Sequence, residues 1–156
     1  MYQLIIANKN YSSWSLRVWL LMQQIKIPFS ERLITFEQGN SREKFSRISP
    51  TGLLPCLIDE DTLIWDSLAI VEYLAEAFPE IWPTNKLVRA WARSATCEMH
   101  SSLQFFNSKS LSCATQVELK HLPEKSREDI IRVDRLWQEG LKSLAAPSWQ
   151  AKILLL

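Results

Sequence analysis

Three serines near the start of the chain are the residues whose type and position best suit chemistry. Ser12, Ser13 and Ser15 follow a short apolar run and a turn-like stretch, where side-chain hydroxyls can cap a helix. A helix N-terminus exposes unpaired N–H groups and the positive end of a dipole, which favour an anion. A hydroxyl there can also donate to a thiolate and lower the pKa of that thiol. Taken alone, the cluster fits N-capping better than catalysis, because serine is a preferred cap.

Two further pairs of residues could take part in binding a ligand. Pro55 lies near the start of an apolar run and removes a donor from a strand ladder. If the Leu54–Pro55 bond is cis, the backbone of Leu54 can turn its N–H and C=O toward a ligand, although base rates alone favour a trans bond. Asp66 and Ser67 precede a helical pattern and form an acceptor–donor pair that suits the amino and carboxylate groups of an amino acid. Ordinary capping is the simpler interpretation of this pair by itself.

The elements that must position these residues follow from the hydrophobic spacing. The chain begins with a strand, a helix and a strand, a βαβ unit that implies parallel pairing and a right-handed crossover. A short irregular helix, a hairpin, a helix and a proline-containing linker follow, and the rest is helical. This order predicts an α/β domain followed by an all-α region. The expected strands cover 3–7, 29–34, 53–58 and 62–65, and the expected helices lie within 14–25, 37–46, 68–78, 85–107 and 123–144.

Composition argues against several classes of protein. The chain has 18 Lys and Arg against 17 Asp and Glu, so its net charge of +1 selects neither nucleic acid nor an acidic membrane. Its three cysteines form no CxxC pair and, with two histidines, give no metal-ligand pattern. Reduced thiols in a cytoplasmic protein fit better than disulfides or zinc. No signal-peptide pattern is present, and no apolar run approaches the roughly 20 residues that span a bilayer.

As a set, the three features resemble the N-terminal domain of the cytosolic glutathione transferases, in particular the serine-type, zeta-like group. The resemblance rests on the sequences of residues 12–17, 49–55 and 65–74, in this order and spacing, and it covers residues 1–80 without a break. It implies a thioredoxin-like, glutathione-binding domain over 1–80. A partial, all-α domain over 85–156 would then lie on the side of a second substrate.

The resemblance also implies a role for each matching residue. Ser12 matches the hydroxyl that stabilises the glutathione thiolate, and Ser13 and Ser15 are near alternatives. Leu54 matches the residue whose backbone pairs with the cysteinyl part of glutathione. Pro55 matches the family's cis-proline, so the resemblance predicts a cis bond here.

At the other end of the ligand, Asp66 and Ser67 match the pair that holds the γ-glutamyl group. The sequence departs from the family at two positions. Zeta-class isomerases usually carry Cys where this chain has Trp14, which argues against a specific maleylacetoacetate isomerase activity. Leu53 stands where the family often has a polar residue that contacts the glycyl end, so that contact must come from elsewhere, and Lys44 and Arg42 are the candidates.

The resemblance implies a transferase that uses glutathione as co-substrate, activates its thiol as thiolate and attacks a small electrophile, as in detoxification. A cytoplasmic homodimer is expected, with no nucleic-acid or membrane partner and no metal. Two alternatives stay open: a glutathione-dependent isomerase, and a catalytically weak glutathione-binding or interaction protein.

The second domain looks shortened at the sequence level. The family's helical domain has a further helix opened by a Ser/Thr-x-x-Asp capping motif, and no aspartate follows Asp134 in this chain. The expectation is a truncated helical domain, from a truncation or a changed reading frame. Such a domain leaves the apolar side chains of Leu136, Trp137 and Leu141 in need of partners.

Overall fold

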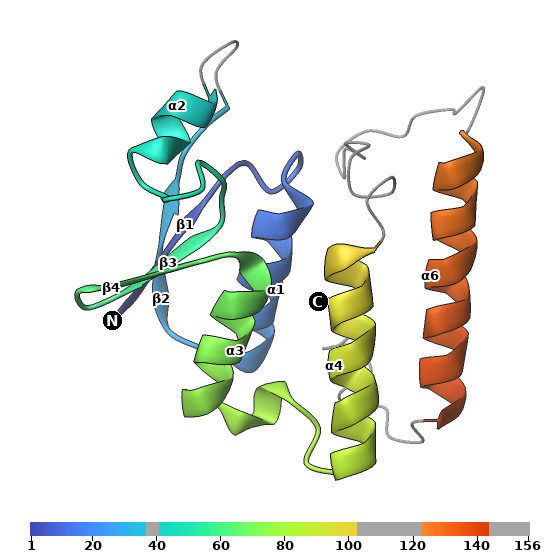
Figure 1. Cartoon of the computed structure of the whole chain (residues 1–156). Helices are drawn as coiled ribbons and strands as arrows, with labels where there is room; N and C mark the ends of the chain where they lie inside the picture. Colours follow the sequence, from blue (N-terminus) through green and yellow to red (C-terminus); the bar gives the residue numbers. More distant parts are fainter. Residues whose placement is uncertain (37–40, 103–122, 144–156) are drawn as a thin grey trace. The chain divides into compact units, whose positions relative to one another are not determined.

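The computed structural model describes residues 1–36, 41–102 and 123–143. Contacts between residues divide the chain into two compact units, Met1–Ile81 and Trp82–Leu156. The first unit is a mixed sheet with helices, and the described part of the second is helical (Figure 1). The predicted order of an α/β region followed by an all-α region is therefore confirmed.

The first unit is built on a four-stranded sheet in the order β2-β1-β3-β4. Its strands are β1 (Tyr2–Ile6), β2 (Phe29–Leu33), β3 (Cys56–Asp59) and β4 (Thr62–Trp65). β1 pairs with β2 in parallel, as the βαβ pattern predicts, whereas β3 runs antiparallel to both β1 and β4. The two central strands are the apolar ones, since a strand covered on both faces must be apolar throughout.

Helices cover both faces of this sheet. Helices α1 (Ser13–Ile25) and α3 (Ser67–Ala77) contact each other on one side, and the short helix α2 (Ser41–Ser46) lies on the other (Figure 1). Successive side chains of a strand point to opposite faces. On the α2 side, Ile5 and Cys56 accordingly join a buried cluster with Phe45, which comes from α2.

The ends of the helices follow local sequence rules. Helix α1 ends at Ile25 and is capped by Lys26 in the left-handed conformation, whose N–H donates to the carbonyls of Gln23 and Met22. Helix α3 ends at Ala77, and its C-cap, Phe78, directly precedes the proline that opens a 3-10 turn, η1 (Pro79–Ile81).

One predicted strand starts later than expected. The apolar run from residue 53 predicts a strand over 53–58, but β3 begins at Cys56. Pro55 has no N–H to donate. One residue further along, the N–H of Ala7, which the β1–β3 register places opposite Leu54, donates to the side chain of Ser15. The ladder between β1 and β3 therefore stops at the pair Ile5–Cys56.

The second unit contains an antiparallel pair of helices, α4 (Lys86–Ser101) and α6 (Glu124–Ser143). Asn85 caps α4, because its Oδ1 accepts from the N–H groups of Leu87 and Val88 at 2.9 and 3.2 Å. The two helices match the predicted 85–107 and 123–144, of which 103–107, 144 and the predicted loop 108–121 lie outside the described residues.

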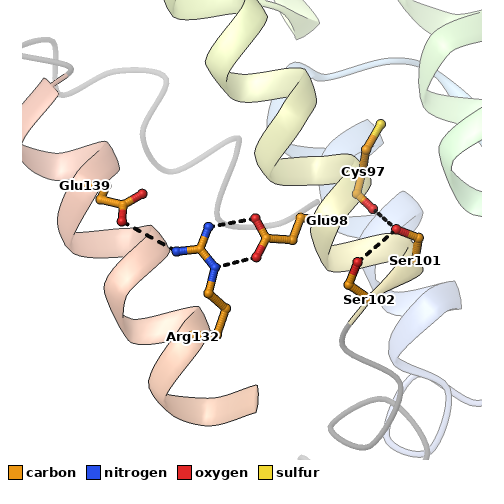
Figure 2. Close-up of polar contacts among 6 residues, drawn as sticks. All are labelled: Cys97, Glu98, Ser101, Ser102, Arg132 and Glu139. Carbon is orange, nitrogen blue, oxygen red and sulfur yellow. Dashed lines mark hydrogen bonds and ion pairs between the residues drawn. The ribbon is translucent and has the colours of Figure 1, made fainter. Parts of the chain in front are cut away.

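An ion pair and a glycine are among the contacts between α4 and α6. Near one end, the guanidinium of Arg132 donates to both carboxylate oxygens of Glu98, with Nη2 and Oε2 2.8 Å apart (Figure 2). Arg132 also reaches Glu139 on its own helix, with Nη1 and Oε1 3.5 Å apart. Near the other end, Gly140 lies against the ring of Trp91, where a Cβ atom would come within 2.5 Å of Cη2. This glycine therefore permits the close approach of the helices.

Candidate functional site

The three predicted serines take three different environments at the start of α1. Ser12 is the N-cap, and its half-buried Oγ accepts from the N–H of Ser15 at 3.4 Å. The hydroxyl of Ser12 donates to Ser15 Oγ at 3.0 Å. Ser15 is fully buried, and its Oγ also accepts from the N–H of Ala7 at 3.1 Å. Ser13 is exposed in the first turn.

The loop that carries Ser12 is fixed by its own backbone. The carbonyl of Asn8 accepts from the N–H groups of Tyr11 and Ser12 at 3.0 and 2.8 Å. The side-chain oxygen of Asn8 accepts from the N–H of Asn10 at 2.9 Å, which is an Asx turn. The turn signal in the sequence at 8–11 therefore corresponds to a defined loop that ends at the cap of α1.

A second contact holds this loop, and sequence reasoning missed it. Glu31 on β2 accepts from Lys9 Nζ at 2.7 Å and from the indole Nε1 of Trp19 on α1 at 2.7 Å. The ammonium of Lys9 also lies 4.6 Å from the centroid of the Trp19 ring. Nothing in the spacing of residues 9, 19 and 31 signals this contact, because it forms only when the βαβ unit closes.

The bond between Leu54 and Pro55 is cis, so this prediction is confirmed. The Leu54 side chain is buried in the cluster on the α2 face. Within the described part of the chain, none of the backbone hydrogen bonds of turns, loops and caps uses the N–H or C=O of Leu54. These two backbone groups can therefore serve a ligand. The preceding Leu53 is 64% exposed.

Cys56, which follows the proline, is fully buried, as expected for a packing residue. Burial raises the pKa of its thiol, and a hydrogen bond from Ser49 opposes that shift. The buried Cys56 is therefore unsuited to thiolate chemistry.

Asp66 caps α3 from an unusual backbone conformation. Its Oδ1 accepts from the N–H of Leu68 at 2.9 Å and of Ala69 at 3.4 Å. Its φ of 76° and ψ of 132° lie where residues with a side chain are rare. Such a conformation costs about 1–3 kcal/mol and is found most often at functional sites. Ser67 follows as the first residue of α3 and is buried.

A cation near the serines was also missed at the sequence level. Arg17 lies one turn along α1, and its guanidinium is 4.3 Å from the centroid of the Trp14 ring. Burial lowers the pKa of Arg17 to about 10. The spacing of Trp14 and Arg17, i and i+3 on one helix, is the signal that would have indicated this pair.

The register of the sheet brings the predicted residues together at one end of its strands, the end where β1 and β4 finish and β3 begins. Cys56 pairs with Ile5 on one side and with Trp65 on the other. The residues just beyond these three positions are the end of β1 that leads to Ser12, the Leu54–Pro55 bond before β3, and Asp66 after β4. Three segments distant in sequence therefore converge where β1 ends, with two helix N-termini beside them.

No group of three His, Cys, Asp or Glu side chains that could hold a metal ion occurs among residues 1–36, 41–102 and 123–143. In the same part of the chain, no helix combines the length and apolar character needed to cross a membrane.

Comparison with known proteins identifies the first unit. Residues 11–77 match the family described as glutathione S-transferase, N-terminal domain. The chain is 29% identical over 94 residues to a probable maleylacetoacetate isomerase of Caenorhabditis elegans, an alignment covering 59% of this chain and 43% of that protein. Over 107 residues it is 29% identical to the glutathione S-transferase GstB of Escherichia coli, covering 61% and 51%. The chain spans about half the length of these relatives.

Solved structures share the fold. Glutathione S-transferase isozyme E7 of Drosophila melanogaster superposes with a TM-score of 0.66 at 22% identity, over 88% of this chain and 64% of that one. An epsilon-class glutathione S-transferase of Musca domestica gives 0.66 at 19% identity, over 91% and 66%. The first unit is therefore similar, in sequence over residues 11–77 and in its thioredoxin-like fold, to the N-terminal domain of the glutathione S-transferases.

Proposed function

We propose that the protein is a glutathione transferase, which binds glutathione, stabilises its thiolate and presents it to a small electrophile. The observation that carries the proposal is the shared end of the sheet at which Ser12, the backbone of Leu54 and the Asp66–Ser67 cap lie, in a domain similar to the N-terminal domain of the glutathione S-transferases. Each of the three segments offers polar groups of the kind that a tripeptide needs.

The chemistry would take place at the N-terminus of α1. A free cysteine thiol ionises near pH 8.5, so most glutathione is protonated at neutral pH. The dipole of α1, the N–H groups of its first turn and the hydroxyl of Ser12 all favour a negative charge on sulfur. The thiol proton leaves to solvent, and the thiolate attacks a carbon electrophile held beside it, which gives the proximity effect. Ser13 is the alternative hydroxyl, because it is exposed in the same turn.

The remaining parts of glutathione would bind the other two segments. The unengaged N–H and C=O of Leu54 suit the cysteinyl backbone. The carboxylate of Asp66 and the first N–H groups of α3, next to Ser67, suit the amino and carboxylate groups of the γ-glutamyl end. Arg42 or Lys44 of α2 would contact the glycyl carboxylate, because Leu53 offers no polar side chain. The helical unit would border the second substrate.

The proposal is tested by retention on glutathione-agarose together with turnover of a halo-nitroaromatic substrate. Retention with turnover that depends on glutathione supports a transferase. Retention without turnover favours the alternative of a glutathione-binding or interaction protein, and loss of both contradicts the proposed function.

A glutathione-dependent isomerase is a second candidate, favoured by similarity to two maleylacetoacetate isomerases. The match to the protein of Dictyostelium discoideum is 32% identical over 95 residues. Against this candidate, the bulky Trp14 lies beside the serines, packed on Arg17, where zeta-class isomerases usually carry Cys. Conversion of a cis-enone diacid to its trans isomer, dependent on glutathione, would decide in its favour.

We further propose that the protein works as a homodimer in the cytoplasm and serves detoxification of electrophiles. The dimer follows from the family resemblance, in which the sheet domain of one subunit meets the helical domain of the other. Light scattering at tens of micromolar is the test, and a monomer mass there would contradict the dimer.

A further inference from the structure

The hydroxyl of Ser15 lies between the end of β1 and the cap of α1. Ser15 Oγ accepts from the N–H of Ala7 at 3.1 Å and from the hydroxyl of Ser12 at 3.0 Å. Since a hydroxyl has two acceptor positions and one proton, both acceptor positions of Ser15 are occupied. Among the described residues the hydroxyl of Ser15 is found only as an acceptor, and the side chain is fully buried, with Ser12 Oγ 3.0 Å away.

In the hydrogen bond between the two serines Ser12 is the donor, so its proton points away from a bound thiolate. Ser12 has one hydroxyl proton, and in this structure that proton is donated inward to Ser15. It cannot be donated to a glutathione sulfur at the same time. For Ser12 to serve the thiolate, its proton must turn outward, which leaves an acceptor position on Ser12 Oγ open toward Ser15.

Building on the proposed function, we propose that Ser15 is a positioning residue whose hydrogen bond with Ser12 reverses when the thiolate binds. Ser15 then donates its proton to Ser12 Oγ, and Ser12 donates its proton to sulfur. The N–H of Ala7 stays on Ser15 throughout, and no covalent bond of the protein changes. The proton of the glutathione thiol leaves to water.

In the reversed arrangement, both hydroxyl protons and both acceptor positions of Ser12 take part in hydrogen bonds. Ser12 Oγ accepts from the N–H and the hydroxyl of Ser15 and donates to sulfur, so both its acceptor positions and its proton are engaged. Ser15 accepts from Ala7 and donates to Ser12, so its buried proton gains an acceptor. Hydrogen bonds in such a chain polarise one another, which strengthens the last bond, the one to the thiolate.

The test is the ultraviolet titration of the thiolate of glutathione bound to the 156-residue chain. Ser15→Ala should raise the pKa of that thiol by about 0.5 to 1 pH unit, the equivalent of one weakened hydrogen bond. Affinity for S-methylglutathione, which cannot ionise at sulfur, should stay within about twofold of wild type, because a neutral thioether gains little from the chain of hydroxyls. Ser15→Cys, a weak donor of similar size, should act like Ser15→Ala, and Ser15→Thr, which keeps the hydroxyl, should restore the wild-type titration.

The matched control is Val71→Ala, which removes methyl groups from the buried face of α3 in the same domain. It should lower stability without moving the thiol pKa. The inference is overturned if Ser15→Ala and Ser15→Cys titrate as wild type, if Ser15→Thr shifts as far as Ser15→Ala, or if Val71→Ala shifts equally. If the thiol pKa is unchanged in Ser15→Ala but raised in Ser12→Ala, this inference fails and the proposed function stands. If the wild-type protein does not bind glutathione, the proposed function fails as well.

Discussion

At the scale of single residues, Ser12 and Asp66 each combine a local structural role with a role proposed for a ligand. Both cap a helix with a side-chain oxygen, at the end of the helix that favours an anion. A substitution that removes the side chain changes stability and binding together. Variants that separate the two effects are therefore the informative ones.

Replacing Ser12 by alanine should raise the pKa of bound glutathione by about 1 to 2 units, since a hydrogen bond to a charged group contributes roughly 1.5–3 kcal/mol. Glutathione affinity should change little, because the backbone of Leu54 and the Asp66 cap hold the rest of the ligand. Thiolate absorbance as a function of pH is the measurement. Ser13→Ala serves as the matched control, and a larger shift in that variant would move the catalytic role to Ser13.

Asp66→Asn should weaken glutathione binding at least tenfold while leaving stability nearly unchanged. Asparagine caps helices as well as aspartate and tolerates positive φ, so the hydrogen bonds to Leu68 and Ala69 survive. The charge that attracts the γ-glutamyl ammonium is lost. Calorimetric titration with glutathione gives the affinity, and urea unfolding gives the free energy of unfolding. Unchanged affinity would show that Asp66 is only a cap.

At the scale of elements, the sequence predicts most of the fold because the first unit obeys local rules. The helices at 14–25 and 68–78 are signalled by hydrophobic spacing and by capping residues, and both form. The features of the fold that the sequence does not predict depend on tertiary contacts. The late start of β3 goes with the Ala7 N–H donating to Ser15 instead of to a neighbouring strand. The hydrogen bond from Lys9 to Glu31 joins residues that no local pattern relates.

The candidate site shows the same division. Its residues are identified by motif, and the cis bond at Pro55 follows from the same resemblance. The different environments of the serines are set by the packing of α1 on the sheet. Ser15 could have been recognised as buried, because it shares a helix face with Val18 and Met22 at spacings of three and seven. The direction of its bond to Ser12 has no signal in the sequence.

Gly140→Ala should lower the free energy of unfolding even though alanine favours a helix over glycine by up to about 1 kcal/mol. The new Cβ would lie 2.5 Å from Cη2 of Trp91, and the ring must move. Overpacking of this kind costs about 1–3 kcal/mol, which outweighs the gain in helix propensity. Thermal unfolding monitored by circular dichroism measures the effect. Combining Gly140→Ala with Trp91→Leu should recover part of the loss, and no recovery would argue against this contact.

The pair Glu98–Arg132 should make the α4–α6 contact sensitive to acid. The hydrogen bond from Arg132 lowers the pKa of the Glu98 carboxyl below its usual value. A carboxyl with a lowered pKa in the folded state stabilises the protein above its unfolded pKa of about 4.3, and that stability is lost as the pH falls through the folded value. The contribution is small, about 1 kcal/mol or less, because both side chains are partly exposed.

Glu98→Gln is the variant that isolates this effect. It should unfold at a lower temperature than wild type at pH 6 and at nearly the same temperature at pH 3. Calorimetry at several pH values between these limits gives the comparison. A difference that stays constant with pH would mean that the pair stabilises the helices by packing alone.

At the scale of the whole molecule, the apolar surface of α6 is the feature with the largest consequence. The sequence leaves Leu136, Trp137 and Leu141 in need of partners. In the structure Leu136 is buried, whereas Trp137 and Leu141 are 46% and 51% exposed. Ile130, about two turns before Trp137 and three before Leu141, is 41% exposed. Exposed apolar side chains that follow one another along a helix favour association.

The expected outcome is that the double variant Trp137→Gln and Leu141→Gln associates less than wild type while keeping its fold. Both side chains are about half exposed, so replacing them removes little buried area and costs little stability. The apparent mass should be followed by light scattering over a range of protein concentrations, with helix content checked by circular dichroism. Leu136→Gln is the contrasting control, since this buried residue should reduce stability by placing a polar group in the helix contact. If the double variant shows the same rise in mass with concentration as wild type, copies of the chain meet through another surface, and the sheet unit becomes the place to look for it.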